Sequence, residues 1–136
     1  MISPTGLGLR NDQAGFGYFD APRGKRRHKG VDFLCNPGVE VVFPFENGKI
    51  LRLAYPYGMD VELGGVYGRA EERGHLLYFK MFYFQPREDI LQLTFQQGTP
   101  IGVAQDVTQR YPATNMQPHV HLQIEMIDPF LLLEEN

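Results

Sequence analysis

The chain has 136 residues, of which 43% are hydrophobic and 21% are charged. This length fits one domain with its own hydrophobic core, which we expect to span residues 1–136, with 1–15 as a peripheral lead-in segment. The 13 basic and 16 acidic residues give a net charge of −3, which argues against nucleic-acid binding by bulk charge. No apolar run reaches 18 residues, so we expect no membrane-spanning helix.

The cysteine content and the N-terminal sequence bear on where the chain works. Cys35 is the only cysteine, so no internal disulfide can form, and we expect a buried structural thiol. The first residues lack a basic start followed by an apolar stretch, so we expect no secretory signal. A cytosolic protein, a mature fragment and delivery by another route all remain open.

The composition indicates β-structure. The 15 glycines and 10 prolines are spread along the chain and mark turns, while seven tyrosines and ten phenylalanines favour strands. No segment sustains a helical apolar period beyond about two turns. We therefore predict a compact, mostly antiparallel all-β domain.

The strand signals begin after residue 30. Asn47-Gly48 predicts a two-residue hairpin turn between strands 39–43 and 49–54. Segment 76–84 is nearly all apolar, which predicts a central strand buried on both faces. Segments 64–74 and 106–118 are predicted as loops, the first of them exposed. The predicted strands are 31–35, 39–43, 49–54, 59–63, 76–84, 99–104 and 119–126.

The last predicted strand alternates cleanly between apolar and polar residues. Its apolar side chains point one way and its polar side chains the other. The apolar set is Val120, Leu122, Ile124 and Met126, and the polar set is His119, His121, Gln123 and Glu125.

Three of the four histidines fall in two short motifs. His28 and Asp32 are four residues apart across Gly30, which lets the backbone bend, and His119 and His121 share one strand face about 6.7 Å apart. Alone, each motif is more often structural. If the segments meet, two histidines, an aspartate and a water would form a catalytic zinc site, and the third imidazole could act as general base.

The basic residues in segment 23–29 and the fourth histidine allow less specific interpretations. Five basic residues lie within 23–29, where a solvated basic turn and a patch for an anionic ligand are both consistent with the pattern. We hypothesise that Arg23 and Arg26 engage carboxylates of a peptide substrate. His75 is predicted to be exposed and without a role.

The motifs together resemble a known family. The stretches HKGVDF, ENGKI, GTPIG and PHVHLQIE, followed by Asp128-Pro129, resemble the lysostaphin/LytM-type zinc endopeptidases over about residues 16–129. HKGVDFLCNPG, FKMFYFQP and RYPATNMQPHVHLQIE are similar to the leukocyte-cell-derived chemotaxin branch of that fold and to its phage and bacterial relatives. The resemblance implies a β-sheet fold, a groove with one zinc ion, and cleavage of peptide bonds in peptidoglycan.

The resemblance also implies roles for individual residues. His28, Asp32 and His121 would ligate zinc, and His119 would be the general base. Active members carry a further histidine in a Tyr-x-His-Leu stretch, and Tyr83 falls near that position here. Alternation from Phe79 and Met81 would turn Tyr83 toward the site, where its hydroxyl could donate a hydrogen bond to an oxyanion. A core tyrosine is the alternative reading.

These residues leave three functions open. The first is a zinc metallo-endopeptidase that acts on the cell wall, outside the cytoplasm, as a virion component, as part of a larger assembly, or after lysis. The second is a catalytically inactive zinc-binding module that holds a glycan, a peptide or a protein partner, which Tyr83 in place of histidine favours. The third is a structural subunit in which zinc only joins loops.

Overall fold

The computed structural model describes residues 1–12, 15–16, 22–23, 26–27, 30–112 and 114–127. Its elements are β1 (Asn11–Asp12), β2 (Gly15–Phe16), β3 (Pro22–Arg23), β4 (Arg26–Arg27), β5 (Val31–Leu34), β6 (Glu40–Val42), β7 (Asn47–Ala54), β8 (Gly65–Glu72), β9 (His75–Phe82), β10 (Phe84–Pro86), β11 (Thr94–Gln96), β12 (Pro100–Ala104), the 3₁₀ helix η1 (Val107–Arg110) and β13 (His119–Ile127).

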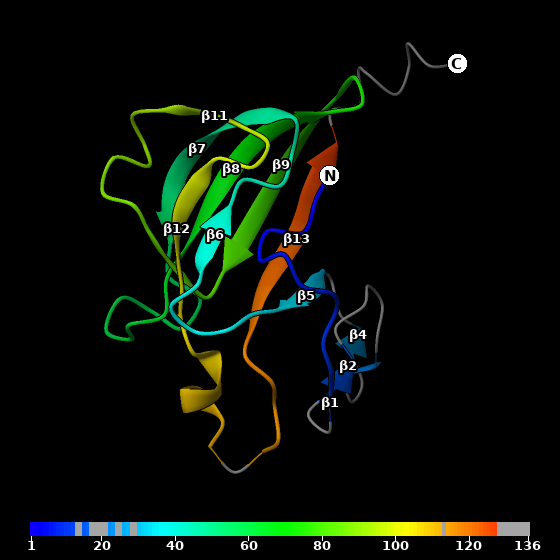
Figure 1. The fold of residues 1–136 in the computed structure, drawn as a ribbon, viewed down its shortest axis with the longest axis vertical. Coiled ribbons are helices and arrows are strands. Elements are labelled where there is room, and N and C mark those ends of the chain that lie inside the picture. The colour runs from blue at the N-terminus through cyan, green and yellow to red at the C-terminus, as the bar shows by residue number, and fades with distance from the viewer. Residues whose placement is uncertain (13–14, 17–21, 24–25, 28–29, 113, 128–136) are drawn as a thin grey trace.

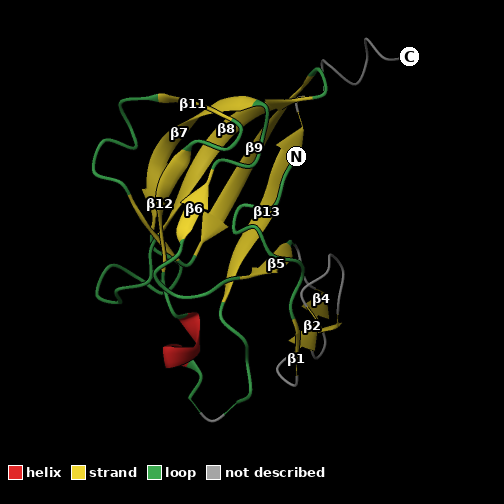
Figure 2. Ribbon diagram, viewed as in Figure 1, coloured by secondary structure: helices red, strands yellow, loops and turns green. Residues whose placement is uncertain are grey.

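Two antiparallel sheets form the body of the molecule. The larger has six strands in the order β11-β7-β8-β9-β13-β5, and the smaller has three in the order β10-β12-β6. Figure 1 shows β6 and β12 lying across one face of the larger sheet, and Figure 2 shows how little of the described chain is helical. The predicted all-β, mostly antiparallel class is confirmed. No helix in the described ranges is long and apolar enough to cross a membrane.

Aromatic residues fill the space between the two sheets. Phe43 is fully buried and meets Phe45, Phe79 and Phe95 with ring centroids 5.8–5.9 Å apart. Burying each such side chain contributes about 1.5–3 kcal/mol to folding. Small residues face these rings from β8, where a Cβ on Gly68 would lie 2.5 Å from the Phe79 ring.

The prediction of a loop over residues 64–74 is wrong, and these small residues explain why. Most of it is strand β8, which directs Val66, Gly68 and Ala70 into the core and Arg69 and Glu71 outward. Glycine and alanine do not register as an apolar face in the sequence, although here they leave room for large rings opposite. Segment 59–63, predicted as a strand, forms turns and bends before β8.

The predicted hairpin turn at Asn47-Gly48 is also wrong. Both residues belong to β7, where they pair with Glu71 and Ala70 of β8. The preceding strand β6 lies in the smaller sheet and pairs with β12. The chain therefore changes sheets between β6 and β7, and a local turn signal cannot reveal that.

Strand β9 is central, as predicted, but it is fully buried on one face only. Leu77, Phe79 and Met81 face the core, and the residues between them are half-buried. His75 begins the strand and is half-buried rather than exposed. In β13, the predicted alternation holds for Val120 and Leu122, whereas Ile124 is exposed beside a register shift between Ile124 and Met126. Strand β11 and helix η1 were not predicted.

Tyr83 marks the point where the chain passes from β9 in the larger sheet to β10 in the smaller one. Its φ is +79°, a left-handed conformation that costs a non-glycine residue about 1–3 kcal/mol. Its N–H donates to the Gly64 carbonyl at 2.8 Å, and its own carbonyl accepts from the Gln105 N–H at 3.0 Å. The backbone bonds on both sides therefore hold the strained conformation.

Cys35 lies in the hydrophobic core, which confirms the buried thiol predicted from the sequence. Burial, and secondarily the negative charge of Asp106, raises the pKa of the Cys35 thiol to about 11. We expect the thiol of the folded protein to resist Ellman's reagent at about pH 8 and to react on unfolding in guanidinium.

The same shift gives a pH dependence. The folded state holds this proton above the reference pKa of 9.0, so the contribution of the thiol to stability is complete below pH 9.0 and is lost as pH rises through about 11. Rapid labelling of the native thiol would contradict this, and Cys35→Ala is the control that removes the titration.

Candidate metal centre

Pairing of β5 with β13 brings together three of the predicted site residues. Asp32 lies directly opposite His121 in the register, and its Oδ1 is 2.8 Å from His121 Nδ1. His119, two residues earlier on the same strand face, has its Nε2 3.7 Å from Asp32 Oδ2. Asp32 and His119 are almost fully buried, at 3% and 4% exposed.

Arg10 supplies a cation to this cluster. Its guanidinium Nε is 3.2 Å from Asp32 Oδ2, and the arginine is 3% exposed. The backbone holds it there, since the Arg10 N–H donates to the Asp32 carbonyl at 2.8 Å and the Leu34 N–H donates to the Gly8 carbonyl at 2.7 Å. Residues 8–10 therefore run against β5, and Arg10 completes the site. A buried carboxylate needs such compensation, because an isolated buried charge is costly.

The protonation of His119 follows from its hydrogen bond and its burial. Its Nδ1 lies 2.8 Å from the Gln117 carbonyl, which can only accept, so this nitrogen carries the proton. Burial lowers the pKa of His119, and nearby Asp32 opposes this effect only in part. The ring is therefore neutral near pH 7, with the Nε2 lone pair turned toward Asp32.

A chain of polar side chains orients His121. Its Nε2 lies 3.1 Å from Gln123 Oε1, and the Gln123 amide N–H donates to Glu125 Oε2 at 3.4 Å. Glu125 is itself paired with Lys80 at 2.6 Å. Because the amide nitrogen is used by Glu125, the amide oxygen faces the imidazole. This favours the tautomer with the proton on Nε2 and a lone pair on Nδ1.

Gly30 packs directly against the His121 imidazole. A Cβ at position 30 would lie 2.5 Å from the Leu122 carbonyl oxygen and 2.8–2.9 Å from two atoms of the His121 ring. Only glycine allows this close approach. Gly30, the last residue of the HKG motif, thereby lies against β13, the strand that carries His119 and His121.

The cluster forms one wall of a cavity of about 420 Å³. Three tyrosines lie on another wall: the Tyr57 hydroxyl is 2.5 Å from that of Tyr111 and 3.4 Å from that of Tyr83. The Tyr57 and Tyr83 rings stack, and the Tyr83 ring meets His119 edge-on at 5.4 Å. The lining residues are Arg10, Asp32, Tyr57, Tyr83, Val107, Tyr111, Thr114, Met116, His119 and His121.

Burial makes these hydroxyls harder to ionise. It raises the pKa of Tyr57 and Tyr111 to about 12 and raises that of Tyr83 as well. Each tyrosine is therefore a hydrogen-bond donor at neutral pH. Tyr83 lines the cavity, but the predicted alternation from Phe79 and Met81 does not put it there, because both of those residues face the core. The positive φ turns it into the cavity.

The structure does not describe the side chains of the remaining predicted site residues. His28 lies outside the described residues, as does Asp128-Pro129. Arg23 and Arg26 face each other in the β3–β4 hairpin, and their side chains are not described. Within the described ranges, no three His, Cys, Asp or Glu side chains form a metal-holding group, so the zinc assignment stays a prediction.

Sequence reasoning missed Arg10, Tyr57, Tyr111 and Gln123. Gln123 could have been found, because it shares the polar face of the HxH strand. The other three reach the site from the N-terminal segment, the β7–β8 connection and the loop after η1. No local pattern marks them.

The fold and the site define an all-β domain with a buried His–Asp–His cluster at the wall of a cavity. No family model matches the chain. The chain is 29% identical over 123 residues to leukocyte cell-derived chemotaxin-2 of Bos taurus, covering 90% of this chain and 76% of the relative. It is 33% identical over 113 residues to leukocyte cell-derived chemotaxin-2 of Mus musculus, covering 82% of this chain and 69% of the relative.

The identity and coverage of the mouse relative show that this chain belongs to the family of leukocyte cell-derived chemotaxin-2. The relation is a distant one. It agrees with the branch that the sequence motifs indicated, whereas the wider relation to lysostaphin/LytM-type peptidases stays a prediction.

The close approach of Gly30 can be tested by stability measurements. We expect Gly30→Ala to destabilise the protein by about 1–3 kcal/mol, because the added methyl displaces His121 or the Leu122 carbonyl. Gly8→Ala is a matched control, since a Cβ there meets nothing within 4 Å, and it should change stability by less than about 0.5 kcal/mol. Urea unfolding measures both, and equal effects would show that position 30 has room.

Proposed function

We propose that this protein is a zinc metallo-endopeptidase that cleaves peptide bonds in bacterial peptidoglycan. The observation that supports it is the convergence of Asp32, His119 and His121 on one cavity wall. His28, Asp32 and His121 would hold the metal. Zinc bound there supplies a Lewis acid that polarises a carbonyl and acidifies a water molecule.

The described donors fit a metal ion. The two nitrogens of His121 face two acceptors, Asp32 Oδ1 and Gln123 Oε1, but a neutral imidazole carries only one proton. Either the ring is a doubly protonated cation, or a cation lies between Nδ1 and the carboxylate. With the proton on Nε2, the Nδ1 lone pair and the carboxylate converge from neighbouring strands on one point.

The protein's own groups would handle the proton and the charge. His119 is neutral, with Nδ1–H held by the Gln117 carbonyl, so Nε2 can accept a proton from water. Tyr83 keeps its proton and can donate a hydrogen bond to a developing oxyanion. The Tyr57 hydroxyl contacts that of Tyr83, and Tyr111 in turn holds Tyr57.

A second candidate function is a zinc-binding module without catalysis. The residue that favours it is Tyr83, because a hydroxyl with a raised pKa cannot share proton transfer near neutral pH as a histidine can. The same cavity, walled by Tyr57, Tyr83 and Tyr111, would then hold a peptide, a glycan or a protein partner.

Metal content and peptide release distinguish the two functions. We expect one zinc per chain in the wild type and in His119→Ala, and its loss in Asp32→Asn. Release of amino groups from purified sacculi should fall by about 10²–10⁴-fold in His119→Ala, because the general base is lost.

Tyr83→Phe isolates the contribution of the Tyr83 hydroxyl to peptide release, since it removes the hydroxyl and keeps the ring. Zinc without release from several wall types would favour the binding module. Absence of zinc from protein refolded with the metal would contradict both functions.

Gln123 tests the orientation of His121. We expect Gln123→Leu to weaken zinc binding by about 10–100-fold, measured by competition with a chelator, because the imidazole loses the acceptor that selects its tautomer. Gln123→Glu keeps an oxygen acceptor for the imidazole and should bind zinc more tightly than Gln123→Leu. Nitrogen NMR shifts of His121 in the metal-free protein give a second readout, and an unchanged tautomer in Gln123→Leu would contradict this role.

A further inference from the structure

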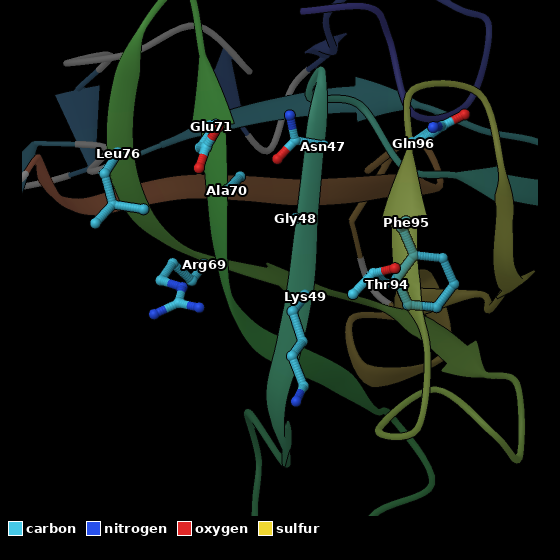
Figure 3. Close-up of a pocket in the computed structure, with 10 residues that line it drawn as sticks. All are labelled: Asn47, Gly48, Lys49, Arg69, Ala70, Glu71, Leu76, Thr94, Phe95 and Gln96. Atoms are coloured by element: carbon cyan, nitrogen blue, oxygen red, sulfur yellow. The ribbon is translucent and has the colours of Figure 1, made fainter.

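A second hollow lies on the outer face of the six-stranded sheet, away from the metal centre. Its volume is about 510 Å³, and it is formed by β7, β8, β11 and the start of β9. Figure 3 shows Lys49 and Arg69 extending side by side from neighbouring strands, with Leu76 on one flank and Thr94 on the other. The lining residues are Asn47, Gly48, Lys49, Arg69, Ala70, Glu71, Leu76, Thr94, Phe95 and Gln96.

Two cations face each other across the strands of this hollow. Lys49 and Arg69 are directly opposite in the β7–β8 register, and both are exposed. Like charges in directly opposed positions of an antiparallel pair are destabilising. Neither side chain forms an ion pair with any residue that the structure describes, and Glu71 is the one carboxylate in the lining. The arrangement therefore has a net positive charge that a bound anion would neutralise.

The lining is arranged in two rows across the sheet. One row carries Thr94, Lys49 and Arg69. The next row, two residues along each strand, carries Gln96, Asn47 and Glu71, and it ends at Leu76.

The first row offers two cations and a hydroxyl, which suit one oxyanion. The second offers amides, a carboxylate and an apolar edge, which suit hydroxyl groups and a sugar face and disfavour a second anion.

We propose that this hollow binds a saccharide that bears one oxyanion, a sulfate, phosphate or carboxylate, with the oxyanion between Lys49 and Arg69. The volume is several times what an isolated oxyanion fills and lies within the range of small-ligand pockets. The proposal does not depend on the metal centre.

A nucleic acid fits the lining less well. Single-stranded binding uses exposed aromatic side chains on which bases stack. Phe95 is the one aromatic residue in the lining, and it is 2% exposed because its ring packs on Phe43 inside the core. The net charge of −3 also disfavours a polyanion.

Calorimetric titration of the full chain with an otherwise neutral tetrasaccharide that carries one sulfate group tests the proposal. We expect saturable binding that weakens about tenfold or more in Lys49→Gln and in Arg69→Gln, because each loses a charged hydrogen bond to the anion. The desulfated tetrasaccharide should not bind measurably. Inorganic sulfate and phosphate should compete weakly, because they fill only the first row.

Arg52→Gln is the matched control. It removes one positive charge from the same sheet face outside the hollow, where Arg52 stacks over Tyr67 at 4.1 Å. It should leave the affinity within about twofold of wild type, and equal weakening in all three variants would overturn the proposal in favour of bulk electrostatics.

If saccharide binding changes no amide NMR shifts at residues 47–49 and 69–71, the proposal is overturned. Tighter binding of a single-stranded oligonucleotide than of the saccharide would also overturn it. A metal chelator should leave saccharide binding unchanged, which separates this proposal from the metal centre.

Discussion

The antiparallel pairing of β5 with β13 is the constraint on which the site depends. It places Asp32 opposite His121 and makes the carboxylate almost inaccessible to water. A carboxylate so buried is tolerated only with compensation, which Arg10 of the N-terminal segment supplies. His119 and His121 of β13 lie beside the same carboxylate.

The same buried charge joins structure to function. Removing Arg10 or Asp32 leaves the other charge buried and uncompensated, which costs several kcal/mol when one member of a buried pair is lost. A metal ion held by Asp32 and His121 would take over part of this compensation, and Arg10 would keep the remaining carboxylate oxygen in place. The N-terminal segment therefore belongs to the site, although its sequence is glycine-rich and shows no strand or helix period.

Tyr83 shows how backbone strain and position are coupled. The chain must leave the larger sheet after β9 and enter the smaller sheet at β10, and one residue makes that change. Its positive φ reverses the alternation, so the side chain turns toward the cavity instead of the core. A glycine would relieve the strain but would remove the ring that stacks on Tyr57 and meets His119.

Local patterns in the sequence were sufficient for some features and insufficient for others. The all-β class and the His119–His121 face follow from strand alternation, which one segment can display. Strand β8 was missed because its core face consists of Val66, Gly68 and Ala70, whose small size matters only against Phe79. The hairpin at Asn47-Gly48 failed because membership in a sheet depends on distant partners. Arg10 and Tyr57 reach the site through tertiary contacts alone.

The two hollows share one face of the larger sheet. His121 lies opposite Phe82, Lys80 lies opposite Tyr67, and Arg69 lies opposite Lys49. Opposed residues and residues two apart point the same way, so the imidazole and the cationic pair face the same solvent. Three strand spacings and four residues along the strands separate them by roughly 20 Å. A ligand that contacts both hollows at once would therefore have to span roughly 20 Å, the length of about six extended residues.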